Sequence, residues 1–440
     1  MDSPIASSEP ANPSPVPFPG VLAPPTVATG GPPPEQGGSG YRSVLRNRRY
    51  LLYQASAIAS TTGYAVYSIA IPWLAYVTTG SFVAVGLVLF LEIGVYSLTF
   101  LAAPLVDRAA DKRLIFLIGY PIQAVAAAGL AFAAAHGELT LPLLLVVVVV
   151  LAIGWDFEWA VFQVAPRLLL RKNELFAGGG LSSALGGGVQ VGGYAAGAGL
   201  ILLSGAAGTG YLYAGLLVLS TFLALLVPLR GGESAERDYL AGFRAGWRYL
   251  VTRAGRPLLQ LGVLDAFAGF FVAALPVLIT LVAGRSFPNP SLAYGVLFTS
   301  FVLGGVSMDL VLGHYNPRGH VGVVLVGGLS VSAVALYLTG VFPPSLLLTS
   351  LAWFVAGGAL GSYSSGKTTF LWGYVPPQQL ARVTSNLYVF PGTAGAIGAV
   401  VLGGLASRLG PGALTTIVAL VLVAAAASSV LLPAIRKLAF

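Results

Sequence analysis

Long apolar runs dominate this sequence and limit what it can fold into. From Tyr50 onward we count twelve runs that could cross the hydrocarbon core of a bilayer, which takes roughly 20 helical residues. In lipid, only helices and closed barrels satisfy their own backbone hydrogen bonds. The runs lack the strict alternation of barrel strands, so they predict twelve transmembrane helices. We expect these spans near residues 50–77, 82–104, 114–135, 141–165, 175–203, 211–229, 257–283, 292–313, 321–341, 346–372, 383–406 and 413–433.

The composition agrees with a membrane protein. Of the 440 residues, 56% are apolar and only 9% are charged, whereas about a quarter are charged in ordinary soluble domains. This balance excludes a soluble enzyme, a disordered chain and a nucleic-acid-binding module, although the net charge is +8. The chain has no Cys and three His, so we expect no disulfide, no metal centre and no cofactor.

The first residues differ from the rest of the chain. Residues 1–40 contain eleven Pro and six Gly but no Lys or Arg. Such a segment cannot build a core, so residues 1–41 are expected to form a disordered, Pro-rich cytoplasmic tail. It lacks the basic and apolar regions of a secretory signal peptide.

Lys and Arg predict the orientation of the spans. If both termini are cytoplasmic, 20 of the 23 basic residues lie in the cytoplasmic loops and ends. This bias is the positive-inside pattern of helical membrane proteins. We therefore expect a multi-pass protein of the plasma membrane with both termini in the cytoplasm.

The longest connection, residues 230–256, divides the chain into two sets of six spans, 42–229 and 257–440. Within it, apolar and basic side chains separate onto different faces of a helix. The apolar set is Tyr239, Phe243, Trp247 and Leu250, and the basic set is Arg237, Arg244 and Arg248. This pattern predicts an amphipathic helix on the anionic cytoplasmic leaflet, with a short soluble linker helix as the alternative.

Several loop motifs carry a family resemblance. Residues 103–113 read A-P-L-V-D-R-A-A-D-K-R. This stretch resembles the signature of the major facilitator superfamily, Gly-x-x-x-Asp-Arg followed by a basic cluster, with Ala103 in place of Gly. The matching residues are Asp107, Arg108, Lys112 and Arg113.

Two further stretches resemble the exporter branch of this superfamily. Residues 188–197 read G-V-Q-V-G-G-Y-A-A-G and look like the antiporter motif, with Gly193 in place of its Pro. Residues 375–385 read V-P-P-Q-Q-L-A-R-V-T-S and include Arg382. They look like a loop of drug and siderophore exporters, including macrolide-efflux-like proteins.

The resemblance implies an all-α membrane fold of two pseudo-symmetric six-helix bundles around a central cavity. It also implies that Asp107, Arg108, Lys112, Arg113 and Arg382 form a cytoplasmic gate. The small residues of the 188–197 motif would let that span pack tightly against a partner helix, as in any close-packed membrane helix.

Six ionisable residues fall inside predicted spans. A charge at this depth costs at least ~2.5–3.5 kcal/mol unless it is paired, protonated or hydrated. Five acids cannot all pair with one Lys, so we expect either that several carboxyls are protonated at neutral pH or that they face a wet cavity. Both outcomes suit a proton-coupled carrier. The six are Glu92, Asp156, Glu158, Asp265, Asp309 and Lys367.

Four of these residues lie on spans that line the cavity in the superfamily. Asp156 and Glu158 are on the fourth span, Asp265 is on the seventh, and Lys367 is on the tenth. Asp156 and Glu158 lie about 200° apart around a helix, and we favour Asp156 as the cavity residue because Glu158 can extend toward the loop. Lys367 is expected to pair with Asp265 or with a fourth-span carboxylate, or else to extend toward the cytoplasm. Glu92 is a second candidate proton site or a hydrogen-bonded structural acid.

Polar and aromatic side chains of the first and fourth spans are candidates for contact with substrate. Gln54, Tyr64 and Tyr67 lie on the first span, and Trp155 lies on the fourth. Tyr64 and Tyr67 share a helix face, and an aromatic pocket suits an amphipathic cargo. Plain helix packing is the alternative for both tyrosines.

One motif is misleading. Residues 361–368 read G-S-Y-S-S-G-K-T and match the phosphate-binding loop pattern letter for letter. That loop needs a preceding strand and a soluble α/β domain, whereas this stretch lies within an apolar span. We therefore expect no nucleotide binding.

These features predict a transporter and not an enzyme. We expect a monomeric carrier in the lipid bilayer that exports amphipathic small molecules in exchange for protons, by alternating access. The alternatives are a symporter or uniporter of a sugar, peptide or carboxylate, and a non-transporting membrane receptor or scaffold. Buried ionisable groups disfavour the last alternative, because a scaffold gains nothing from their cost.

Overall fold

The computed structural model describes residues 41–97, 105–106, 109–171, 174–229, 239–252, 255–315, 321–375 and 377–431, and residues 1–40 of the expected tail lie outside them. The described regular structure is helical. The helices are α1 (Tyr41–Arg46), α2 (Arg48–Thr79), α3 (Phe82–Tyr96), α5 (Arg113–Ala135), α6 (Leu141–Leu169), α7 (Leu175–Leu225), α8 (Tyr239–Val251), α9 (Arg256–Ser286), α10 (Pro290–Tyr315), α11 (Val321–Val341), α12 (Leu346–Tyr374), α13 (Pro377–Arg408) and α14 (Pro411–Leu431).

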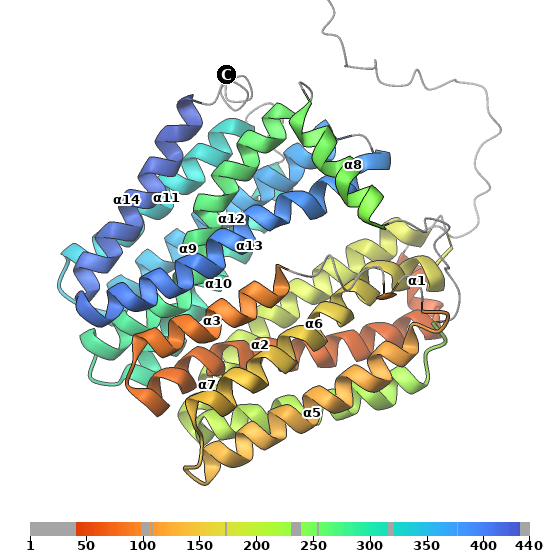
Figure 1. Ribbon diagram of the computed structural model, residues 1–440, viewed down its shortest axis with the longest axis horizontal. Coiled ribbons are helices and arrows are strands. Elements are labelled where there is room, and N and C mark those ends of the chain that lie inside the picture. The colour runs from red at the N-terminus through yellow and green to blue at the C-terminus, as the bar shows by residue number, and fades with distance from the viewer. Residues whose placement is uncertain are drawn as a thin grey trace, which may run out of the picture.

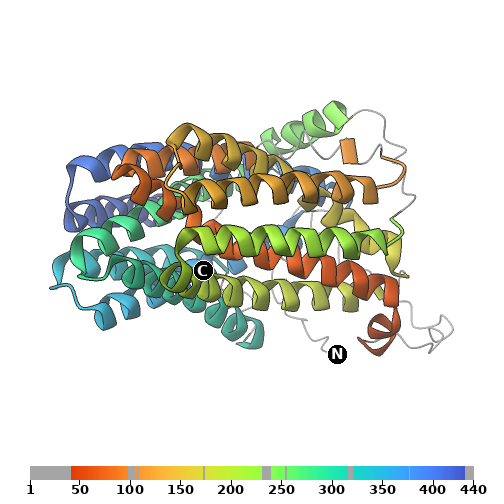
Figure 2. The same cartoon turned by 90° about the horizontal axis from the view of Figure 1, so that it is seen from below.

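The described part of the chain contains nine helical segments that are long and apolar enough to cross a membrane. They are α5, α6, the second part of α7, and α9 to α14. The predicted twelve are completed by α2, by α3 and by the first part of α7. Figure 2 shows that the helices of both halves run lengthwise in roughly one direction, as membrane-spanning bundles do.

Helix α7 contains two predicted spans. Gly205 divides it, with φ 65° and ψ −173°, a conformation that residues other than glycine rarely adopt. Gly193 packs against Ala65 of α2, and Tyr213 packs against Gly63 of α2. Residues 20 positions apart in a straight helix would be about 30 Å apart, so the chain folds back at Gly205 and lays both parts against α2.

The two halves pack closely on the side opposite the termini. A Cβ added at Gly86 of α3 would lie 2.5 Å from the carbonyl oxygen of Ala399 in α13. The hydroxyl of Tyr294 in α10 donates to the carbonyl oxygen of Ile69 in α2 at 3.0 Å. The ring of Tyr294 also lies 5.2 Å from that of Trp73. These contacts lie near the α2–α3, α9–α10 and α13–α14 turns, so the halves are closed together at that end.

The connector helix α8 packs partly against protein. The ring of Trp247 lies 5.8 Å from that of Phe390 in α13, and Leu250 is fully buried. Arg244 and Arg248 are exposed. Part of the face that we expected in the lipid leaflet therefore docks onto the second half. In Figure 1 the two halves are inclined to one another, and α8 lies at the end where they diverge.

Candidate functional site

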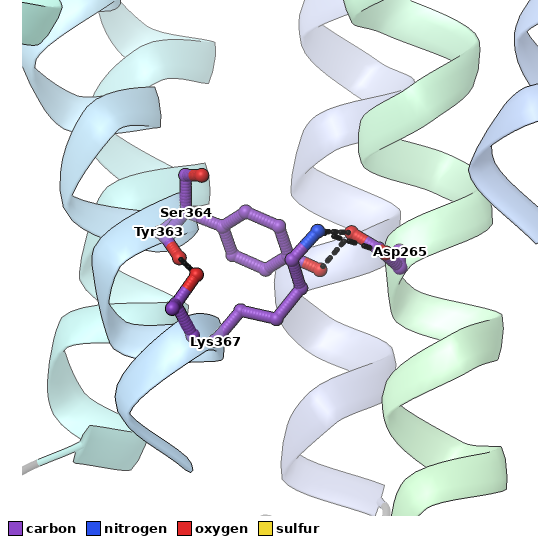
Figure 3. A network of polar contacts seen from close by, with 5 residues as sticks. Asp265, Tyr363, Ser364 and Lys367 are labelled. Carbon is purple, nitrogen blue, oxygen red and sulfur yellow. Dashed lines mark hydrogen bonds and ion pairs between the residues drawn. The ribbon is translucent and has the colours of Figure 1, made fainter. Parts of the chain in front are cut away.

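An ion pair lies inside the second half. The Nζ atom of Lys367 in α12 is 3.0 Å from both carboxylate oxygens of Asp265 in α9. The hydroxyl of Tyr363, one helical turn before Lys367, donates to the same carboxylate at 3.2 Å. Figure 3 shows Lys367 and Tyr363 extending from α12 toward Asp265 on α9. Asp265 is thus bound by one cation and one phenol in a position that is only 7% exposed.

This geometry decides between the partners considered for Lys367. The pair with Asp265 is present, but both residues belong to the second half. The pair therefore does not bridge the two halves, as a pair with a fourth-span carboxylate would. Asp265 lies about 14 Å from the start of α9 and Lys367 about 10 Å from the end of α12, at 1.5 Å per residue. Both distances place the pair toward the side of the termini.

A small pocket adjoins the pair. It has a volume of about 10 Å³, about the space that one water molecule needs, and is lined by Gly262, Leu371, Thr384 and Tyr388 beside the two charged residues. The ammonium of Lys367 lies 5.7 Å from the centre of the Tyr388 ring, within range of a cation–π attraction. The pocket offers a negative group, a positive group and an aromatic face within a few ångströms.

The phosphate-loop letters do not form a loop. Residues 361–368 are helical throughout and lie within α12. Lys367, which would contact phosphate in such a loop, is instead paired with Asp265. Within the described residues, no group of three or more His, Asp or Glu side chains could hold a metal ion.

The first half holds a buried carboxylate without a described cation beside it. Glu158 of α6 is 1% exposed. It accepts a hydrogen bond from Ser60 Oγ of α2 at 2.6 Å and one from Gln123 Nε2 of α5 at 2.5 Å. The amide oxygen of Gln123 accepts from the hydroxyl of Tyr213 in α7 at 3.2 Å. Four helices therefore contribute to one polar cluster, which we call the Glu158 cluster.

Close packing fixes the Glu158 cluster. Gly154 lies one turn before Glu158, and a Cβ at this position would overlap the Gln123 side chain. The smallest residue thus leaves room for the amide to reach the carboxylate. Ser60, Gln123 and Tyr213 are each fully buried.

Our preference between the two fourth-span acids is not supported. We expected Asp156 to face the cavity and Glu158 to extend toward the loop. Glu158 instead lies within the first bundle, bonded to neighbouring helices, and Asp156 is 5% exposed. Sequence could not show this, because hydrogen-bond partners on other helices decide which acid turns inward.

Glu92 and two aromatic residues form a second cluster in the first half, the Glu92 cluster. The hydroxyl of Tyr64 in α2 donates to Glu92 Oε1 of α3 at 2.8 Å. The Tyr64 ring stacks on Trp155 of α6, with centres 4.1 Å apart and planes inclined by 10°. All three side chains are half-buried.

Two expected cavity residues lie elsewhere. Gln54 is 5% exposed and donates to the hydroxyls of Tyr50 and Ser182 between α2 and α7. Tyr67 is 1% exposed and packs its ring 5.1 Å from that of Tyr213. Both therefore belong to the helix packing of the first half, which was the alternative considered for Tyr67.

Only part of the expected gate is described. Asp107 and Arg108 lie outside the described residues, as does the side chain of Arg382. Lys112 is fully buried, and its Nζ donates to the carbonyl oxygen of Ala109 at 3.1 Å. Arg113 forms an ion pair with Asp111 at 3.5 Å and donates to the carbonyl oxygen of Leu225 at 3.2 Å. These contacts tie the loop after α3 to the end of α7.

The loop before α7 is tied to α1 in a similar way. Glu174 accepts hydrogen bonds from Ser43 Oγ at 2.5 Å and from the backbone N–H of Arg171 at 3.0 Å. The Ser43 hydroxyl, and next the Arg171 N–H, favour the ionised form and lower the pKa of the Glu174 carboxyl. The Glu174 carboxyl therefore stays ionised at neutral pH.

Sequence reasoning missed Gln123, Tyr213, Tyr363 and Tyr388. Gln123 carries a signal, because it is an amide within the apolar segment 113–135, and a buried amide needs partners. The tyrosines carry none, because phenols are frequent on membrane helices and sequence does not show which face meets an acid.

Comparisons with known proteins identify the fold. No protein-family model matches the sequence, and no curated protein sequence matches it. Among solved structures, a nucleoside transporter, NupG, superposes with a TM-score of 0.68 at 12% identity, over 86% of this chain and 98% of that one. A POT family transporter in complex with 5-aminolevulinic acid gives 0.72 at 11%, over 88% and 97%.

A third structure agrees with the first two. A bacterial homologue of the human lysosomal transporter Spinster, in an inward-facing and occupied conformation, gives a TM-score of 0.61 at 16% identity, over 90% of this chain and 96% of that one. The chain therefore has the major facilitator fold, with twelve spans in two pseudo-symmetric bundles. It is a multi-pass membrane protein whose structural neighbours are transporters and not enzymes.

Proposed function

We propose that the protein is a secondary active transporter that exports amphipathic small molecules in exchange for protons. The fold supports alternating access, and the 188–197 and 375–385 stretches support the exporter branch. The basic residues support cytoplasmic termini, and such a topology suits the plasma membrane. The carrier works as a monomer, because one chain supplies both bundles.

The observation that carries the proposal is the burial of the Glu158 carboxyl group among neutral hydrogen-bond donors. Its described hydrogen-bond donors are the neutral groups of Ser60 and Gln123. An ionised carboxylate at this depth is costly even with two donors, and taking up a proton removes that cost. Glu158 therefore suits a group that is loaded and unloaded with protons during the cycle.

The cycle follows from this charge change. With the termini in the cytoplasm, the contacts of Tyr294 and Gly86 close the outer side of the molecule. Cargo leaves when that side opens, and a proton enters from outside to Glu158 or to Glu92. Return to the present arrangement releases the proton to the cytoplasm. Asp107, Arg108, Lys112, Arg113 and Arg382 would close the inner side in the other state.

Asp156, Asp265 and Lys367 have supporting roles in this proposal. Asp265 is already neutralised by Lys367 in this conformation. Cargo or a proton that reaches Asp265 would free Lys367. Binding of cargo or of a proton in the second half would therefore change the charge at this pair. Asp156 remains a candidate proton site on α6.

A second candidate is proton-coupled uptake of a small zwitterionic or carboxylate substrate. The arrangement of Asp265, Lys367 and Tyr388 favours it, because opposite charges and an aromatic ring lie close together. The POT family structure with 5-aminolevulinic acid is a protein of this fold that binds such a molecule. Antiport is preferred, because Asp265 and Lys367 satisfy one another whereas Glu158 has no described cation beside it.

Proteoliposomes with an imposed pH gradient test the proposal. We expect a gradient that drives protons against the cargo to concentrate an amphipathic dye such as Hoechst 33342, and Glu158→Gln to abolish this accumulation. Glu138→Gln, at an exposed carboxylate between α5 and α6, is the control and should behave as wild type. Dye flux that ignores the gradient would remove proton antiport. Gradient-driven uptake of 5-aminolevulinic acid without dye export would establish the second candidate.

A further inference from the structure

The Glu92 cluster contains an arrangement that helix packing alone does not require. Tyr64 lies almost parallel to Trp155 at 4.1 Å, and its hydroxyl donates to Glu92 at 2.8 Å. Three helices, α2, α3 and α6, each supply one group. One phenol thus covers an aromatic face and satisfies a carboxylate at the same time.

The surroundings place this cluster close to the second half. Helices α2 and α3, which carry Tyr64 and Glu92, contact α9 of the second half. The rings of Tyr194 and Phe298, one from each half, lie 5.3 Å apart. Glu92, Tyr64 and Trp155 each keep part of their surface exposed.

We propose that Tyr64 is an internal placeholder for cargo and that the cluster binds planar phenolic compounds. The cargo ring would take the place of the Tyr64 ring on Trp155, and its hydroxyl would donate to Glu92. This inference rests on the proposed transport function and names the substrate class of the site. The displaced Tyr64 side chain moves by an ordinary rotamer change.

The chemistry of the placeholder specifies the class of ligand. A stacked aromatic pair makes a favourable contribution to binding beyond that of its buried area. A cargo ring on Trp155 recovers this contribution only if it is planar. Glu92 Oε1 accepts the hydrogen bond of the Tyr64 hydroxyl, so a cargo that replaces Tyr64 must also bring a donor at the edge of its ring, as a phenol does. An aryl ether offers the same plane without the donor.

Tyr64 and a bound cargo ring would compete for the same face of Trp155, and this competition changes the Kd of the cargo. If Tyr64 covers Trp155 for about 90% of the time, the apparent Kd is about tenfold weaker than that of an open site. Removing the Tyr64 ring should therefore tighten binding of a phenol, whereas truncating a residue that directly contacts the ligand would weaken it. The direction of the change in Kd therefore distinguishes a placeholder, whose removal tightens binding, from an ordinary lining residue, whose removal weakens it.

The test uses 7-hydroxycoumarin and its methyl ether, 7-methoxycoumarin, with purified full-length protein in detergent. Binding of the first is followed by fluorescence anisotropy at a pH where its hydroxyl is protonated, and binding of the second by competition. Tyr64→Ala should bind 7-hydroxycoumarin about tenfold tighter than wild type, and Tyr64→Phe, which loses only the hydroxyl, about threefold tighter. Both variants should prefer the hydroxyl compound to the ether, and Glu92→Leu should abolish this preference.

Tyr337→Ala is the matched control, because it removes an exposed tyrosine of α11 in the other half, and its Kd should equal that of wild type. Equal or weaker binding by both Tyr64 variants would overturn the proposal. So would equal affinity for the ether, or tightening for the cation ethidium without tightening for 7-hydroxycoumarin. Binding in detergent needs no pH gradient, so failure of this site is distinguishable from failure of proton antiport.

Discussion

Asp265 and Lys367 hold opposite charges 3.0 Å apart within the second bundle, and each depends on the other. Removing one partner of a buried pair leaves an uncompensated charge and typically costs about 3–5 kcal/mol, whereas replacing both can be nearly neutral. We therefore expect Lys367→Met to destabilise the protein strongly and the double variant Asp265→Asn with Lys367→Met to recover most of the loss. Thermal unfolding in detergent measures both.

The same variants test whether the pair has a transport role. Transport by the double variant should lose its dependence on the pH gradient only if Asp265 exchanges protons in the cycle. Additive destabilisation of the two single variants would show that the residues do not interact, which contradicts the geometry in Figure 3.

Sequence alone identified the acids and the lysine of the site, because an ionisable residue within an apolar run is rare and costly. It also named Asp265 as one partner of Lys367. It could not show that Glu158 turns into the first bundle, because Ser60, Gln123 and Tyr213 come from three other helices. Side-chain direction at a helix contact depends on the partners and not on local spacing alone.

At the scale of elements, α2 and the first part of α7 show how glycine permits close packing. A Cβ at Gly197 would lie 2.7 Å from the carbonyl oxygen of Val66 in α2, whereas nothing lies within 4 Å of one at Gly192. We expect Gly197→Ala to destabilise the protein by about 1–3 kcal/mol through overpacking. Gly192→Ala should be neutral or stabilising, because Ala favours helix by up to about 1 kcal/mol over Gly. Paired melting curves in detergent give the difference.

The elements themselves were largely predictable. The expected spans 114–135 and 346–372 correspond to α5 at Arg113–Ala135 and α12 at Leu346–Tyr374, because apolar length dictates a helix in lipid. The 188–197 motif predicted tight packing, but the glycines in contact are Gly193 and Gly197, while Gly188 and Gly192 face no neighbour within 4 Å. The docking of Trp247 onto Phe390 was not predictable, because an amphipathic pattern does not distinguish lipid from protein as the apolar partner.

At the scale of the whole molecule, closure between the halves depends on contacts such as that between Gly86 and Ala399. We expect Gly86→Ala to disfavour this closed end and to populate the opposite state. Since the chain has no Cys, spin labels at Val77→Cys and Leu292→Cys report the distance across that end directly. Double electron–electron resonance should show an additional population with a longer distance between the labels for Gly86→Ala. Gly94→Ala is the control, because nothing lies within 4 Å of a Cβ there. An unchanged distance distribution in Gly86→Ala would contradict the closure argument.

Proton antiport by this molecule requires that a carboxyl group inside the first bundle gains and loses a proton. Infrared difference spectroscopy of the purified protein, titrated with acid, detects the C=O stretch of a protonated carboxyl without knowledge of the cargo. We predict a band that appears on acidification, is absent from Glu158→Gln and persists in Glu138→Gln. Identical spectra for wild type and Glu158→Gln would contradict the central claim.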